Sequence, residues 1–129
     1  MKTLVALALV VAALAPAVVA QTASFTGKWE GTLIFLRPNG SEGDTDPVVL
    51  DLTQKGKALT GTLGSGKEQW KIDKGAVNSG KATFEVQEPN GPLYKFTLTI
   101  VKGRLQGEMI GERDGVVGGK AKVDATKAK

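Results

Sequence analysis

The sequence contains no cysteine and no histidine. Without cysteine the chain has no disulfide, no thiol nucleophile and no site for a lipid-modified cysteine after a leader. Without histidine it lacks the usual general base of enzymes. Because both residue types are missing, nearly every zinc, copper or iron site of ordinary ligand chemistry is excluded. We therefore expect neither a metal site of this kind nor a cofactor.

The remaining polar residues do not restore a catalytic site. The acids Glu30, Asp51, Glu85 and Glu108 alternate with apolar residues in a way that places them on the outward faces of strands. The serines have no histidine to activate them. We therefore predict no catalytic residues and a protein that is not an enzyme.

Charge of one sign is not concentrated anywhere in the chain. The 17 basic and 13 acidic residues give a formal net charge of +4 and alternate in sign along the sequence. A nucleic-acid-binding protein carries a basic block or stripe, which is missing here. We expect a solvated exterior and no nucleic-acid partner.

Residues 1–20 have the form of a secretory signal peptide. Lys2 precedes an apolar run over residues 4–15, and small residues lead up to Ala20. The run is shorter than the ~20 residues that a membrane-spanning helix needs, and Pro16 interrupts it. The sequence therefore predicts cleavage after Ala20, a secreted or periplasmic protein, and no membrane span in the cleaved chain.

The rest of the chain is predicted to be one β domain over residues 21–126, followed by a frayed tail at 127–129. From Thr26 to Leu36 apolar residues alternate with polar ones, which places Trp29 and Phe35 on one face of a strand. Further alternating stretches cover residues 48–54, 58–63, 68–77 (with a bulge at Gly75), 81–87, 93–101, 104–111 and 116–126. About eight short strands without helical period predict an all-β antiparallel up-and-down barrel, with a two-sheet sandwich as the alternative.

The segment Arg37–Pro47 is rich in turn formers and is predicted to be the longest loop of the domain. Its residues 39–46 include Glu42, Asp44 and Asp46, whose oxygens are of the kind that calcium binds. The same composition is typical of a solvated turn, so the sequence leaves both interpretations open.

Gly27-Lys28-Trp29 resembles the G-x-W motif that begins the first strand of the calycins, the family of lipocalin, fatty-acid-binding and avidin-like barrels. The resemblance implies a calycin-like barrel with Trp29 packed across its floor and a basic residue of the last strand over the indole. Lys122 and Lys120 are the candidates for that cation. In the avidin-like members, polar residues two and six positions after the Trp contact the ligand, but here these positions are Gly31 and Phe35, and the C-terminal tryptophan motif is missing. Biotin binding is therefore not expected, and the whole pattern resembles small secreted bacterial β domains.

Five aromatic residues are candidates for a ligand site, namely Trp29, Phe35, Trp70, Tyr94 and Phe96. All fall on predicted inward faces, where they either line a cavity or fill the core. The first possibility predicts a monomeric binding module for a small apolar or amphipathic ligand. The second predicts a structural or protein-interaction domain, such as an inhibitor or an envelope accessory protein, and the sequence leaves the two open.

Overall fold

The structure is a computed structural model that describes residues 23–65 and 67–129, so the expected signal peptide lies outside the described residues. The described part contains no helix long and apolar enough to cross a membrane. Its strands are β1 (Gly27–Leu36), β2 (Glu42–Lys55), β3 (Ala58–Gly64), β4 (Gln69–Lys71), β5 (Asp73–Asn78), β6 (Lys81–Gln87), β7 (Leu93–Val101), β8 (Arg104–Arg113) and β9 (Val116–Lys127).

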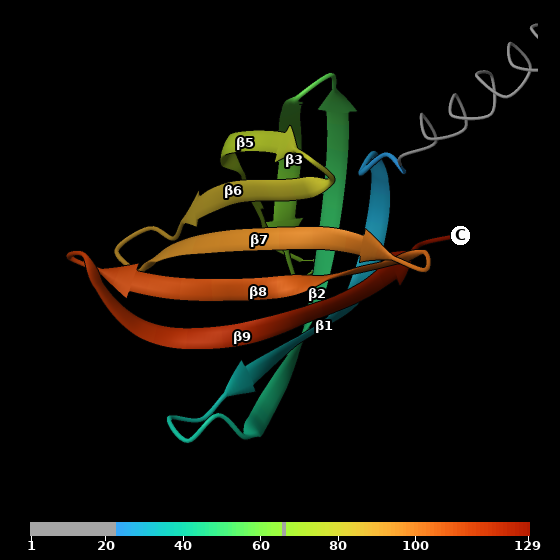
Figure 1. Cartoon of the computed structure of the whole chain (residues 1–129). Helices are drawn as coiled ribbons and strands as arrows, with labels where there is room; N and C mark the ends of the chain where they lie inside the picture. Colours follow the sequence, from blue (N-terminus) through green and yellow to red (C-terminus); the bar gives the residue numbers. More distant parts are fainter. Residues whose placement is uncertain (1–22, 66) are drawn as a thin grey trace, which may run out of the picture.

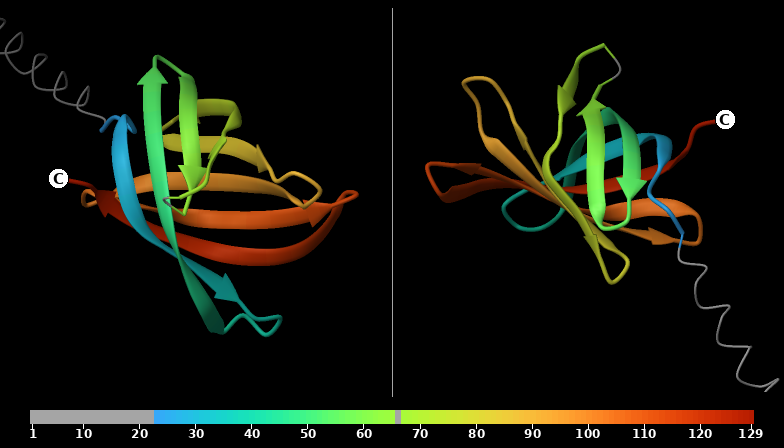
Figure 2. Two further views of the ribbon diagram at one scale, coloured as in Figure 1. Left: turned by 180° about the vertical axis from the view of Figure 1, so that it is seen from behind. Right: turned by 90° about the horizontal axis from the view of Figure 1, so that it is seen from above.

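The strands form a closed antiparallel barrel (Figure 1). Apart from β4 and β5, each strand pairs with its neighbour in sequence, and β9 returns to pair with β1, which completes the ring. The short strands β4 and β5 both pair with β3 and are two halves of one strand interrupted at Ile72, so the ring has eight positions. The predicted eight-stranded up-and-down barrel is confirmed, and the sandwich alternative is not (Figure 2).

The predicted alternation accounts for the core. Leu50 and Leu52 of β2, Ala82 and Phe84 of β6, and Leu98 of β7 are at most 2% exposed, as their inward positions require. The bulge expected at Gly75 is also found, because the register of β5 on β6 shifts between Asp73 and Ala76. Two-residue turns such as Lys102-Gly103, in which both residues have positive φ, join neighbouring strands with the twist that hairpins favour.

The predicted loop from Arg37 to Pro47 is wrong in its extent. Strand β2 begins at Glu42, and its first residues pair with the end of β1, with Asp46 opposite Leu33. This part of β2 pairs only with β1, so Pro47 lies on an edge that does not need its missing N–H. The turn itself needs only residues 37–41, and β1 and β2 project from the barrel as a two-stranded arm (Figure 1).

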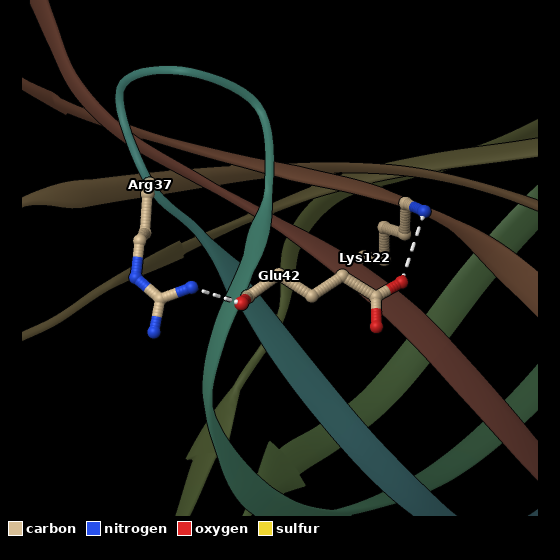
Figure 3. A network of polar contacts seen from close by, with 3 residues as sticks. All are labelled: Arg37, Glu42 and Lys122. Atoms are coloured by element: carbon tan, nitrogen blue, oxygen red, sulfur yellow. Dashed lines mark hydrogen bonds and ion pairs between the residues drawn. The ribbon is translucent and has the colours of Figure 1, made fainter.

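An ion pair connects this arm to β9, and a hydrogen bond crosses the turn of the arm itself. Lys122 Nζ lies 3.2 Å from Glu42 Oε2, and the Arg37 guanidinium donates a hydrogen bond to the backbone carbonyl of Glu42 (Figure 3). The Lys122 and Glu42 side chains are more than half exposed, so the pair contributes at most ~1 kcal/mol to stability. Lys122 therefore forms its ion pair with Glu42 and does not cover Trp29, so the prediction that it lies over the indole is wrong.

The floor of the barrel is built around Trp29. Its Nε1 donates a 2.9 Å hydrogen bond to the carbonyl oxygen of Phe25, and both side chains are at most 2% exposed. Lys127 Nζ lies 5.5 Å from the indole centroid, because the register of β1 on β9 places Lys127 directly opposite Trp29. A basic residue of the last strand does cover the indole, but it is Lys127 instead of Lys122 or Lys120. Strand β9 includes Lys127, and the Ala128 amide donates to the Lys28 carbonyl, so the expected tail begins inside the sheet.

The seam between β1 and β9 depends on Gly31. A Cβ at this position would lie 2.0 Å from the carbonyl oxygen of Asp124 and 2.5 Å from the Cα of Ala125. Both of these atoms belong to the backbone of β9, so they cannot rotate away from an added side chain. The two strands that close the barrel approach each other this closely only because residue 31 has no side chain.

We expect Gly31→Ala to destabilise the fold by at least about 2 kcal/mol and to lower Tm by about 10 °C, because β1 and β9 must separate. The measurement is thermal unfolding followed by far-UV circular dichroism. Gly118→Ala is the matched control, because Gly118 also lies in β9 but its Cβ would meet no atom within 4 Å. Equal Tm values for the two variants would contradict this account of the seam.

Candidate ligand-binding cavity

A cavity of about 450 Å³ lies at the end of the barrel opposite Trp29. Because neighbouring strands run in opposite directions, this end collects residues from the second halves of β1, β3, β6 and β8 and from the first halves of β2 and β7. Its lining comprises Leu33, Phe35, Asp46, Pro47, Val48, Leu63, Gly64, Ser65, Glu68, Trp70, Val86, Glu88, Tyr94, Phe96 and Met109. The wall is therefore mostly apolar, with a few polar groups.

Four of the five aromatic residues predicted for a ligand site line this cavity. Phe35, Trp70, Tyr94 and Phe96 come from β1, β4 and β7, and closure of the barrel brings them together. Trp29 does not join them. It lies six residues before Phe35 on the same strand, a distance of ~20 Å along an extended chain, and it packs into the floor.

The half of the barrel below the cavity is filled by side chains. Phe84 and Phe96 stack with ring centroids 4.8 Å apart and an interplanar angle of 17°. Leu98 and Leu105, deeper in the barrel, have no exposed surface. The described interior of the barrel is thus packed around Trp29 and open around Tyr94, so its room for a ligand lies at the mouth.

Tyr94 supplies an oriented polar group in the cavity wall. Its hydroxyl donates a 2.9 Å hydrogen bond to Glu88 Oε2, across the turn between β6 and β7. Burial raises the pKa of the Tyr94 phenol, and the hydrogen bond to Glu88 and the charge of that carboxylate raise the pKa further, although Arg113 lowers it. The phenol is therefore a neutral donor over the whole physiological pH range.

Sequence reasoning missed three acids in the lining, Asp46, Glu68 and Glu88. Each lies two residues along the chain from an apolar residue of the same lining, respectively Val48, Trp70 and Val86. Strand side chains alternate with period 2, so the acids continue the inward face beyond the apolar part of each strand. This spacing was visible in the sequence, but it points to the cavity only once the strand ends are known to meet.

The segment 39–46 does not gather its acids into a metal site. Glu42, Asp44 and Asp46 belong to an extended strand, and the described residues contain no group of three or more acidic, histidine or cysteine side chains that could hold a metal ion. The calcium interpretation of this segment depended on a loop that is not formed.

The sequence has one tyrosine, so its titration can be followed without overlap from another phenol. We expect the ultraviolet absorbance of the phenolate to appear with a midpoint above the ordinary value of about 10. Because the folded-state pKa lies above the unfolded one, the linked stability is present below about pH 10 and is lost as the pH rises through the folded-state pKa.

Glu88→Gln should lower the pKa of Tyr94 but leave it above the ordinary value, because burial is the largest cause and remains. Glu85→Gln is the control, since Glu85 lies on the same β-hairpin but pairs with Lys74. An ordinary midpoint in the unchanged protein, or no response to Glu88→Gln, would count against the Tyr94–Glu88 contact.

Comparison of the chain with models of known protein families and with curated proteins found no match. The cavity, the residues that line it and the architecture that places them at one end of the barrel are therefore the guide to function.

Proposed function

We propose that the protein is an exported, monomeric, non-catalytic β-barrel that binds a small apolar or amphipathic molecule in the cavity at its mouth. The observation that carries this proposal is the 450 Å³ cavity with Phe35, Trp70, Tyr94 and Phe96 in its wall. Small-molecule sites are concave, have volumes of roughly 300–1,000 Å³, and combine an apolar wall with a few oriented polar groups. Tyr94, held by Glu88, is such a group.

The alternative is a structural or protein-interaction domain whose core is filled. The packed floor around Trp29 is consistent with this alternative. Val116 and Val117, at the tip of the β8–β9 hairpin, are 68% and 49% exposed and form a small apolar surface that a protein partner could contact. This alternative leaves the aromatic cavity at the mouth without a role, whereas ligand binding gives it one.

Two features support a relationship of the barrel to the calycins. The G-x-W motif begins the first strand of a closed antiparallel barrel, and a cation from the last strand, Lys127, covers the indole. We propose that the relationship extends to ligand binding in the barrel mouth but not to biotin. Gly31 has no side chain, and its environment admits none. The export of the protein follows in this proposal from the signal-peptide pattern of residues 1–20.

The proposal is tested by titration with N-phenyl-1-naphthylamine, a neutral probe whose fluorescence rises in an apolar site. We expect saturable binding by the unchanged protein. Leu33→Trp should weaken it at least about tenfold, which corresponds to ~1.4 kcal/mol, because Leu33 lines the cavity and a larger side chain occupies its volume.

Ile100→Trp is the matched control. Ile100 is also a half-buried aliphatic residue packed against the core, but it does not line the cavity. Circular dichroism of both variants checks that they fold. If the probe fails to bind the unchanged protein, or if Ile100→Trp weakens binding as much as Leu33→Trp, the cavity is not the binding site. Native mass spectrometry of protein purified from its own host would then identify any molecule that it carries.

A further inference from the structure

We propose that the ligand carries a positive charge, and that Asp46, Glu68 and Glu88 select an amphipathic organic cation over neutral or anionic molecules of the same shape. The inference rests on the proposed binding function, because it concerns the same cavity. It goes further by naming the charge of the ligand and the side chains that recognise it.

The charge of the cavity lining is opposite to that of the protein. The chain has more basic than acidic residues, 17 against 13. The charged residues in the lining are nevertheless three acids, and no lysine or arginine is among the described lining residues. A cleft lined by one sign of charge on apolar walls focuses the electrostatic potential toward an oppositely charged ligand.

The three carboxylates form no ion pair in the described part of the chain. In residues 23–65 and 67–129 the ion-paired acids are Glu42, Glu85, Glu112 and Asp124. Asp46 and Glu68 are exposed and form no ion pair within that part of the chain, and the Glu88 carboxylate accepts its hydrogen bond from the neutral Tyr94 hydroxyl. Their negative charge therefore remains available to a ligand.

Two basic residues line a neighbouring hollow. This second space of about 330 Å³ shares Phe35, Tyr94 and Met109 with the cavity and also contacts Arg113 and Lys120. Both cations thus lie along the β8–β9 side, whereas the acids come from β2 and from the turns that follow β3 and β6. A ligand seated in the larger cavity meets the carboxylates.

The wall of the cavity suits an organic cation better than a metal ion. The acids are spread around the mouth and form no group that could hold a metal in the described part of the chain. The side chains of Phe35, Trp70 and Tyr94 provide apolar contact, and an aromatic ring attracts a cation placed over its face within ~6 Å. An amine attached to an apolar or aromatic body uses both the wall and the acidic rim.

The test uses three molecules with the same ring system and different charge. Near neutral pH, 1-naphthylmethylamine is a cation, 1-naphthylmethanol is neutral and 1-naphthoate is an anion. We expect calorimetric titration at low salt to give the order amine, alcohol, carboxylate, with the amine bound about tenfold more tightly than the alcohol. Added salt should reduce this ratio, because exposed charges are screened.

The triple variant Asp46→Asn, Glu68→Gln, Glu88→Gln should abolish the preference for the amine, so that the amine and the alcohol bind within about twofold of each other, a difference of ~0.4 kcal/mol. The control is the triple variant Glu30→Gln, Asp51→Asn, Glu108→Gln. It changes the net charge by the same amount at exposed residues outside the cavity, so it should retain the preference.

The outcomes separate the two proposals. Equal binding of amine and alcohol, tighter binding of the carboxylate, or an equal loss of preference in both triple variants would overturn the charge selection while leaving the binding module intact. If neither the naphthalene compounds nor N-phenyl-1-naphthylamine binds, the binding function itself fails and the charge selection fails with it.

Discussion

The structure depends on the contact between the first and last strands. Strand β9 returns to β1 along residues Trp29 to Phe35, and this pairing closes a meander of hairpins into a ring, so that the first and last strands cover each other's edges. The two strands approach so closely that backbone atoms of β9 occupy the space that a side chain at Gly31 would need. Trp29 lies at one end of the seam, with Phe25 and Lys127 around it. Closure therefore fixes which end of the barrel is the floor.

Once the floor is fixed, the geometry of the other end follows. An eight-stranded barrel is just wide enough either to fill with side chains or to hold one small ligand. This barrel does both at different depths. The stacked rings of Phe84 and Phe96 and the buried Leu98 fill the part toward the floor, and the half-buried Trp70 and Tyr94 line an opening above them.

The sequence was sufficient to predict the barrel because alternation with period 2 is a local property. Val48 and Phe84 had to point inward wherever their strands paired. The features that it did not reveal depend on tertiary contacts. Phe25 precedes the first alternating stretch, and its burial follows from the Trp29 hydrogen bond. Residues 42–47 look like a loop, but the end of β1 offers them a partner strand. Lys127 covers the indole because of the β1–β9 register, which no single stretch of sequence determines.

The acids at the mouth follow the same alternation, which makes their positions informative. Asp46 and Glu88 continue inward faces whose neighbouring members are the buried Val48 and Val86. Carboxylates around an apolar cavity repel one another and gain nothing from the apolar wall beside them, so apart from the Glu88–Tyr94 hydrogen bond they add no stability to the fold. Lysine, the commoner charge in this chain, would solvate the rim equally well. Residues that are unfavourable for the local structure are concentrated at binding sites, because the ligand provides the interaction that the protein itself lacks there. A cationic ligand would neutralise these carboxylates. Ligand binding therefore explains the acidic rim physically, whereas folding alone does not explain it.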